Sequence, residues 1–392
     1  MDIAALIDFV SARRDEDTAS LALSRDKFPG IDIATACECI EASRKLRVKC
    51  PRWARPDIIC PSALSAEQCS SEETARYKAA LAAGFRRVAD LTGGLGVDFA
   101  AIAYRAEASL YNDMNPLLVE AARHNFAQLG LRGVEFSCRE ITPESVLPLL
   151  RDFRPDLVYI DPARRSKSGG KVFLLKDCTP DLPSLLPALR QLPSVTVIAK
   201  ISPMADITAL RREIGPGLRE IHVVGAAGEC KELLLVIEPG FTGEPTVVKD
   251  TLRFTPSEEV CAPAAPVRLP KVGEMLFEPD KALLKAGCPK LLCSRFGLER
   301  LGGDVPVFIC SDAEALKGHG RLTRVLECTP FSKRAAITLA RQHPDAELLC
   351  RGLRIDTDTL RKSLPLVGGA SLRLLALGLG RLGNHLILTE TI

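Results

Sequence analysis

A short apolar stretch ending in an acid runs directly into a glycine-rich turn at residues 87–97, RVADLTGGLGV. In a parallel sheet, ligands bind beyond the carboxyl ends of the strands, so this turn would face a ligand. Its glycines permit positive φ and a close approach of the backbone to that ligand. The turn lacks the third glycine of the dinucleotide fingerprint and the Gly-Lys-Ser/Thr ending of a phosphate loop. We therefore expect a nucleoside ligand with an uncharged or cationic tail instead of a pyrophosphate.

A second acid, Asp113, follows the next predicted strand, about 20 residues beyond the turn, where such folds place a ribose-binding acid. A carboxylate there accepts hydrogen bonds from both ribose hydroxyls. The alternative is an ordinary left-handed turn and a surface aspartate in an unrelated α/β protein. The agreement in register between the turn and Asp113 favours the nucleoside site.

The spacing Asp90-x-x-x-Gly94-x-Gly96 resembles motif I of class I S-adenosylmethionine (SAM) methyltransferases. The resemblance implies that SAM is the cofactor and that it is bound by the turn and the end of the second strand. The implied cofactor-binding residues are Asp90, Thr92, Gly93, Gly94, Gly96, Asp113 and Met114.

The fourth predicted strand ends in Asp161-Pro162-Ala163-Arg164, which places this segment at the cofactor edge of the sheet. It resembles the Asp/Asn-Pro-Pro-aromatic motif of enzymes that methylate base nitrogens, where the acid holds the target amine. Catalysis by Asp161, Pro162 and Arg164 would then be mainly proximity and orientation. Because alanine and arginine replace the second proline and the aromatic residue, the acceptor atom stays open. Arg164 and Arg165 could instead bind a phosphate or stack on a base, and Asp161 could simply accept backbone hydrogen bonds.

Other residues are expected near the same cavity. The helix predicted to begin after Ser70 or Ser71 precedes the first strand, so Gln68 and Ser70 could line the pocket, although either serine could serve only as a cap. Glu140, after the third strand, is the candidate for an adenine contact. Lys200 ends the fifth strand and faces the ligand crevice, where it could contact the substrate.

From residue 85 to 240, predicted strands and helices alternate as in a Rossmann-like α/β sheet. The predicted strands are 87–91, 108–111, 133–138, 157–160, 195–201, 221–224 and 232–238. Only seven residues join the last two strands, which is too short for a crossover, so the seventh strand must be antiparallel. One reversed strand in a seven-stranded sheet is typical of SAM methyltransferases and distinguishes them from dehydrogenases.

Four motifs together resemble one bacterial family, in which a class I SAM methyltransferase domain precedes a ferredoxin-like and a THUMP-like domain. They are Glu67-Gln-Cys-Ser-Ser71, Asp90-Leu-Thr-Gly-Gly-Leu-Gly96, Asp161-Pro-Ala-Arg-Arg165 and Glu229-Cys-Lys-Glu-Leu-Leu234. The resemblance implies a helical N-terminal region (1–63), the catalytic domain (64–240), a proline-rich linker (241–270), the ferredoxin-like domain (271–315) and the THUMP-like domain (316–392). Since THUMP domains elsewhere bind tRNA, it also implies an RNA partner.

The charge distribution agrees with an RNA-docking C-terminal module. Residues 321–392 contain eleven lysines and arginines against six acids, a net charge of +5, compared with +3 for the whole chain. Arg351 and Arg354 are the candidate RNA contacts in this module. A dimerisation or lid domain with solvated charges is the alternative.

The remaining patterns are less specific. The basic stretch 43–55 contains the single tryptophan, Trp53, and could be a nucleic-acid surface or a solvated helix end followed by a proline turn. The fourteen cysteines do not show the paired spacing of a zinc site, so we expect no metal. Without a signal peptide or a long apolar run, we expect a cytoplasmic protein with no membrane partner.

The sequence thus favours a SAM-dependent methyltransferase that acts on an RNA base, with tRNA as the first candidate. A methyltransferase for a small molecule or a protein, with a purely structural C-terminal module, is the alternative. An RNA-binding protein with a vestigial SAM fold is disfavoured, because Asp90, Gly94, Gly96 and Asp113 form an intact set.

Overall fold

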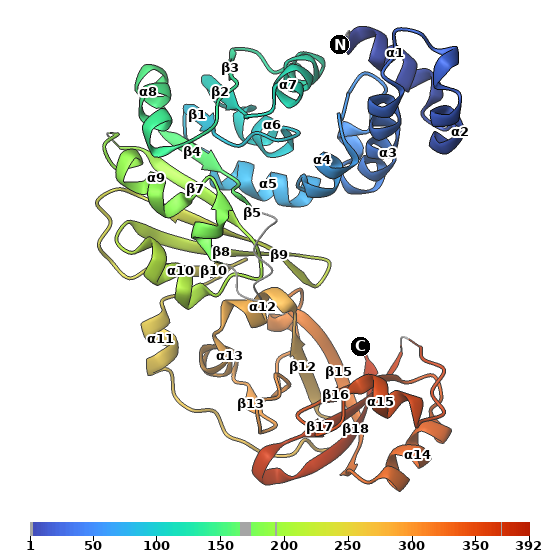
Figure 1. Ribbon diagram of the computed structural model, residues 1–392. Helices are drawn as coiled ribbons and strands as arrows, with labels where there is room; N and C mark the ends of the chain where they lie inside the picture. Colours follow the sequence, from blue (N-terminus) through green and yellow to red (C-terminus); the bar gives the residue numbers. More distant parts are fainter. Residues whose placement is uncertain (1–2, 165–173, 193, 370) are drawn as a thin grey trace. The chain divides into compact units, whose positions relative to one another are not determined.

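The computed structural model describes residues 3–164, 174–192, 194–369 and 371–392. The chain forms two compact units (Figure 1). The first comprises Met1–Ala226 and Lys231–Pro245, and the second comprises Ala227–Cys230 and Thr246–Ile392. Within the described residues, none of the helices combines the length and apolar character needed to cross a membrane.

The first unit is built on a twisted sheet in which the strands follow the order β8-β9-β7-β4-β1-β2-β3. Their bounds are β1 (Arg87–Asp90), β2 (Ala108–Asn112), β3 (Val134–Ser137), β4 (Leu157–Ile160), β7 (Thr196–Ile201), β8 (Leu218–Ala226) and β9 (Glu229–Ile237). The pairs β1·β2, β2·β3, β1·β4 and β4·β7 are parallel, whereas β9 is antiparallel to β7. The predicted Rossmann-like sheet with an antiparallel seventh strand is therefore confirmed.

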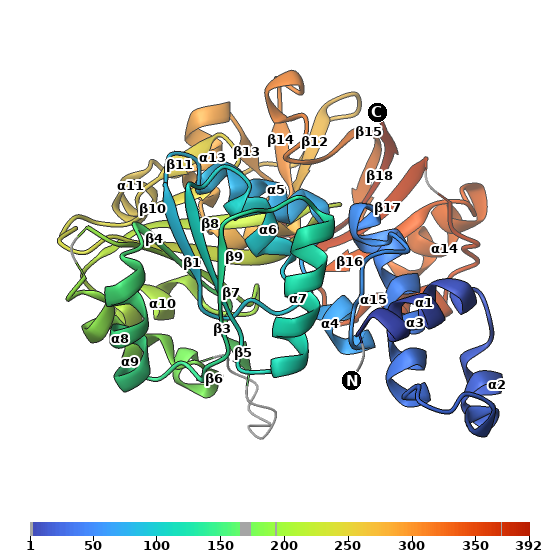
Figure 2. The same ribbon diagram turned by 90° about the horizontal axis from the view of Figure 1, so that it is seen from above.

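Helices cover both faces of this sheet (Figures 1 and 2). One face carries α5 (Glu72–Leu81), α6 (Val97–Ala103) and α7 (Pro116–Gln128), and the other carries α8 (Pro143–Phe153), α9 (Leu182–Leu189) and α10 (Ile207–Ile214). Of the two candidate caps for α5, Ser71 is the one that accepts the first-turn hydrogen bond, from the backbone N–H of Thr74. Ser70 is thereby released for another contact, described below.

The N-terminal region is helical, as predicted, and shares its core with the sheet. It contains α1 (Ile3–Arg13), α2 (Thr18–Leu23), α3 (Ile33–Lys49) and α4 (Ala63–Gln68). Burial raises the pKa of the Cys39, Cys50 and Cys60 thiols in this region to about 12, so these side chains act as small apolar groups.

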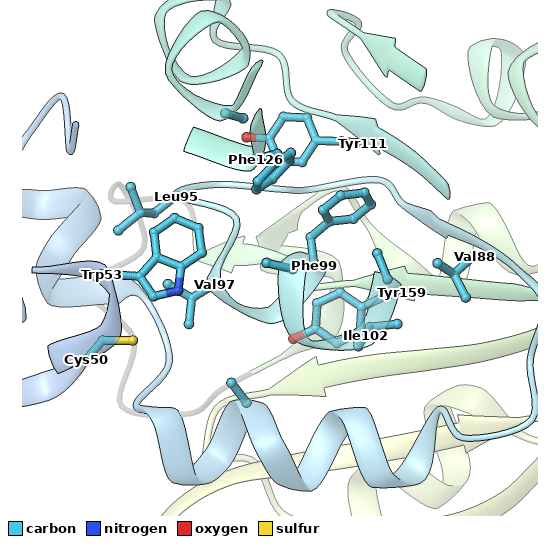
Figure 3. Close-up of a cluster of buried hydrophobic side chains, with 14 of the residues drawn as sticks. Cys50, Trp53, Val88, Leu95, Val97, Phe99, Ile102, Tyr111, Phe126 and Tyr159 are labelled. Atoms are coloured by element: carbon cyan, nitrogen blue, oxygen red, sulfur yellow. The ribbon is translucent and has the colours of Figure 1, made fainter. Parts of the chain in front are cut away.

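Trp53 lies in a single 3₁₀ turn, Pro51–Trp53, and is only 6% exposed. Its indole lies beside Leu95 and Val97 of the glycine turn (Figure 3). It also meets Phe126 edge to face, with the ring centroids 6.5 Å apart. A role for Trp53 as a stacking surface for nucleic acid is therefore wrong, since apolar burial has removed the ring from the surface.

The second unit contains another mixed sheet, with the order β13-β14-β12-β15-β18-β17-β16. Its strands are β12 (Met275–Pro279), β13 (Glu299–Arg300), β14 (Phe308–Cys310), β15 (Gly320–Pro330), β16 (Glu347–Arg351), β17 (Leu372–Gly378) and β18 (Asn384–Thr391). Its helices are α12 (Lys281–Ala286), α13 (Pro289–Phe296), α14 (Lys333–Gln342) and α15 (Thr357–Lys362).

The segment predicted as a linker is partly ordered into secondary structure. It holds the antiparallel pair β10 (Thr246–Lys249) and β11 (Leu252–Phe254), followed by α11 (Pro256–Cys261). The capping box at Thr255 and Glu258 explains why a helix starts within this proline-rich segment. Strands on both sides of the expected boundary at residue 316 pair in one sheet, because β12 is antiparallel to β15. The domain boundaries themselves stay predictions.

Replacing Trp53 by alanine should reduce the free energy of unfolding by about 3–5 kcal/mol, because a large buried ring is lost from the core. Chemical denaturation followed by circular dichroism would measure this change. The exposed neighbour Arg52, substituted by alanine, provides the matched control and should change stability by less than about 0.5 kcal/mol. Equal stability of the two variants would contradict the placement of the indole.

Candidate active site

A cavity of about 710 Å³ opens at the carboxyl ends of the parallel strands in the first unit. It is lined by thirteen of the residues that the sequence nominated. These are Gln68, Ser70, Asp90, Thr92, Gly93, Gly94, Gly96, Asp113, Met114, Glu140, Asp161, Pro162 and Lys200. Their roles remain predictions, but the fold brings them to one place.

Four further nominated residues are placed differently. The backbone of Arg164 lies in the short strand β5 (Ala163–Arg164), which pairs with β6 (Cys178–Thr179). Arg165 lies outside the described residues. Arg351 and Arg354 belong to the second unit, at the end of β16 and just after it, and both are exposed.

The glycine turn lies directly on aromatic rings, which explains two of its glycines. A Cβ atom at Gly93 would lie 2.0 Å from Cε2 of Tyr111, and one at Gly96 would lie 2.6 Å from the Phe126 ring. Gly96 also has a φ of +90°, in the left-handed region. No larger residue can therefore replace either glycine without displacing the aromatic layer.

Asp113 is connected to the turn by hydrogen bonds. Its Oδ2 accepts from the backbone N–H of Gly94 at 2.9 Å, and its Oδ1 accepts from the N–H of Asn115 at 2.8 Å. These bonds fix the carboxylate beside the turn, where it could accept the hydroxyls of a ribose.

Asp90 and Thr92 join the ends of β1 and β4. The Oδ1 of Asp90 accepts the N–H of Thr92 at 2.9 Å, and Oγ1 of Thr92 accepts the N–H of Asp161 at 2.7 Å. Asp90 is almost completely buried, and this burial raises its pKa well above the ordinary value. The backbone at Asp161 is thus positioned by the glycine turn itself.

Asp161 forms an ion pair with Lys200, whose Nζ lies 2.6 Å from its Oδ2. Burial opposes the charge on Lys200, but the neighbouring carboxylates of Asp161, Asp98 and Glu232 prevail and raise the pKa of this lysine. Lys200 therefore remains a cation and cannot act as a base. The pair presents a carboxylate and an ammonium side by side in the cavity.

Behind these residues lies a buried ionic network that the sequence patterns did not predict. Lys78 of α5 is fully buried, and its Nζ lies 2.5 Å from Oε1 of Glu232 on β9 and 3.2 Å from Oδ1 of Asp98 on α6. It also donates to Oγ of Ser70 at 2.9 Å. The other oxygen of Asp98 accepts from Ser70 and from the hydroxyl of Tyr159, each at 2.8 Å.

The network keeps Asp98 charged in spite of its burial. Burial by itself would raise the pKa of this carboxyl, but Lys78, Lys200 and the two hydroxyl donors outweigh it and lower the pKa. One sequence signal could have indicated Lys78. It falls three residues after Ala75 and four before Ala82, on the buried face of the helix.

The part of the cavity around Asp161 is lined mainly by small or aliphatic residues. They are Pro162, Ala163, Thr179, Pro180, Ile201, Ser202 and Pro203. Among the described lining residues, Tyr159 is the only aromatic one, and its hydroxyl is bound to Asp98. The sequence lacks the aromatic residue of the Asp-Pro-Pro-aromatic motif, and the structure does not replace it. None of the described aromatic side chains is available to stack on an acceptor base.

The glycine turn and the acids of the cavity have the properties that a SAM-binding site requires. The glycine turn allows close approach to a nucleoside, Asp113 presents a fixed carboxylate, and buried acids can accommodate a cationic tail. SAM, when bound, supplies a methyl group already activated by its sulfonium. The sheet order and the site together define a class I SAM-dependent methyltransferase.

Comparison with known proteins identifies the family. The chain is 31% identical over 326 residues to an uncharacterized SAM-dependent methyltransferase of Mycobacterium tuberculosis, in strains CDC 1551 / Oshkosh and H37Rv. The match covers 81% of this chain and 83% of that protein. The chain belongs to this family of SAM-dependent methyltransferases, and its cofactor is SAM.

Two further comparisons cover the whole chain and its C-terminal part. A crystal structure of a proposed methyltransferase from Porphyromonas gingivalis W83 superimposes with a TM-score of 0.86 at 30% identity, covering 99% of this chain and 97% of that one. Residues 320–390 match the THUMP domain-like family. The predicted combination of a SAM methyltransferase with a THUMP-like segment is therefore confirmed.

Substituting Asp113 by asparagine should weaken SAM binding by roughly tenfold to a hundredfold, since the site loses a charged acceptor for the ribose hydroxyls. Isothermal titration calorimetry would measure the dissociation constant. Glu135→Gln makes the same chemical change on the neighbouring strand β3, at an exposed position outside the cavity, and should leave the affinity unchanged. If both variants bind SAM like the natural protein, Asp113 does not hold the ribose.

Proposed function

We propose that this methyltransferase modifies a base in RNA, with tRNA as the first candidate, and that its THUMP-like segment docks the RNA. The observation that carries this proposal is the presence of a THUMP-like segment in the same chain as a SAM site. THUMP domains elsewhere bind tRNA, and this one has the excess of positive charge that phosphate contacts require.

The cations of the THUMP-like segment are mostly on its surface. Arg373 is the exception, because it is buried and pairs with Glu278 and Glu347. Eight others are exposed and form no ion pair among the described residues: Lys333, Arg334, Arg341, Arg351, Arg354, Arg361, Lys362 and Arg381. This set supports sequence-independent contacts to a phosphate backbone.

Asp161 would orient the acceptor. One of its oxygens is engaged by Lys200, which, among the described residues, leaves Oδ1 to accept a hydrogen bond from an amine on the base. Lys200 would donate to an adjacent ring nitrogen or carbonyl oxygen. Together they would align the acceptor lone pair with the methyl group, which is catalysis by positioning. The proton released from the methylated nitrogen would leave by way of Asp161 or water, since Lys200 is already protonated.

A small-molecule or protein substrate is the second candidate. The observation in its favour is the lack of a stacking aromatic side chain among the described residues that line the cavity. In that case the THUMP-like segment would have a structural role only.

Methyl transfer from labelled SAM to total tRNA, taken from a strain that lacks this gene, should distinguish the two candidates. A deproteinised small-metabolite extract and a protein extract from the same strain would be tested in parallel. We expect label in tRNA, and nucleoside digestion would then identify the modified base. Label confined to metabolites or proteins would overturn the RNA proposal.

The same assay should show the role of Asp161. Asp161→Ala should reduce methyl transfer by at least about a hundredfold while SAM affinity stays within a few-fold, because the acceptor loses its orienting group. Isothermal titration calorimetry would measure the SAM affinity of the variant. Loss of SAM binding in parallel with activity would assign Asp161 to the cofactor instead.

Substituting both Arg351 and Arg354 by alanine should weaken tRNA binding several-fold and reduce its salt dependence, since up to two phosphate contacts are removed. Filter binding over a range of salt concentrations would measure both effects. Arg25 and Arg105, two exposed arginines of the first unit, serve as the matched double-alanine control. An identical loss in both double variants would argue against docking by the THUMP-like segment.

A further inference from the structure

The cavity carries an excess of negative charge. Among the described lining residues, six carboxylates stand against three cationic side chains. The carboxylates are Asp90, Asp98, Asp113, Glu140, Asp161 and Glu232, and the cations are Arg139, Lys200 and Lys231. Lys78 lies buried behind the lining and offsets one more charge. Burial also raises the pKa of Glu232, which Lys78 and Lys200 offset only in part. With Asp90 protonated, as its raised pKa allows, the sum is negative as long as Glu232 is ionised.

Two of these carboxylates are fixed in the interior of the first unit. Asp98 is 9% exposed and Glu232 is 3% exposed, so solvent and salt screen them weakly. Ser70, Tyr159 and Lys78 hold them by the contacts described above. Their charges are therefore preorganised, and a ligand does not have to reorient them on binding.

One carboxylate oxygen of this network, Oδ1 of Asp98, has no hydrogen-bond donor among the described residues. This oxygen is buried and faces the ammonium of Lys78 at 3.2 Å. Asp98 nevertheless lines the cavity. Because the single ammonium of Lys78 faces both Asp98 and Glu232, it cannot neutralise two ionised carboxylates, and the remaining negative charge can act on a cation in the cavity.

The cofactor changes charge during the reaction, and the affinity of an acidic cavity depends on that charge. SAM carries a positive sulfonium, whereas S-adenosylhomocysteine (SAH), which remains after transfer, has a neutral thioether sulfur. The two molecules are otherwise alike in their adenosine and amino-acid parts. We propose that Asp98 and Glu232 make the cavity selective for cationic SAM over SAH, so that methyl transfer itself loosens the spent cofactor.

The size of the effect follows from Coulomb's law. One unit charge several ångströms from a net negative site, at the effective dielectric constant of protein interiors, changes binding by roughly tenfold to a hundredfold. This selectivity concerns the cofactor alone and does not depend on whether the acceptor is RNA, a protein or a small molecule.

The natural protein provides the first test. Calorimetric titrations with SAM, SAH and sinefungin, which carries an amine in place of the sulfonium, give three dissociation constants. We expect SAM and sinefungin to bind at least about tenfold more tightly than SAH. Equal or tighter binding of SAH would overturn the proposal, whatever the outcome of the tRNA labelling experiment.

Variants then test the named residues. Asp98→Asn and Glu232→Gln each remove one charge while nearly preserving shape, and should weaken SAM binding while changing SAH binding little. Tyr159→Phe is the matched control, because it removes a hydrogen bond to Asp98 without removing charge, and should keep the SAM-to-SAH ratio. A ratio unchanged in both charge variants would show that these carboxylates do not discriminate.

A folding defect would not mimic the expected result. Thermal unfolding of each variant reports stability, and a damaged fold weakens SAM and SAH binding alike. If Asp98→Asn does not fold, Glu232→Gln and the three titrations of the natural protein still decide the proposal.

Discussion

The cofactor site depends on close contact between the backbone of a glycine turn and a layer of aromatic rings. Tyr111 lies under Gly93 and Phe126 lies under Gly96, at distances that leave no space for a Cβ atom. Trp53, from the N-terminal region, packs edge to face on Phe126 and so supports the same layer. The N-terminal helices are therefore part of the structure that shapes the site.

On this apolar base, polar groups join the strand ends to one another. Asp113 binds the turn, Thr92 binds the backbone of Asp161, and Lys200 binds the Asp161 side chain. Each bond satisfies a polar group at the edge of the sheet, and each fixes a group that can contact a ligand. The same bonds that stabilise the edge of the sheet therefore also preorganise the site.

Charge is divided between the two units in a way that suits their proposed tasks. The cavity of the first unit is lined by more acidic than basic side chains, which favours a cationic cofactor and disfavours phosphate groups. The exposed cations of the THUMP-like segment favour phosphate. An RNA substrate would then present an uncharged base to the cavity while its backbone binds elsewhere.

The sequence by itself determined the succession of strands and helices, the antiparallel strand β9 and the edge at which Asp90, Asp113 and Asp161 meet. These features follow from local patterns, namely periodicity, turn residues and a connection too short for a crossover. Only the tertiary structure decided that Trp53 is buried, that Lys200 pairs with Asp161, and that Lys78 meets Glu232 across 154 residues of sequence. Local patterns place charged residues at the surface by default. Which of them are buried, and with which partner, depends on the side chains that folding brings together.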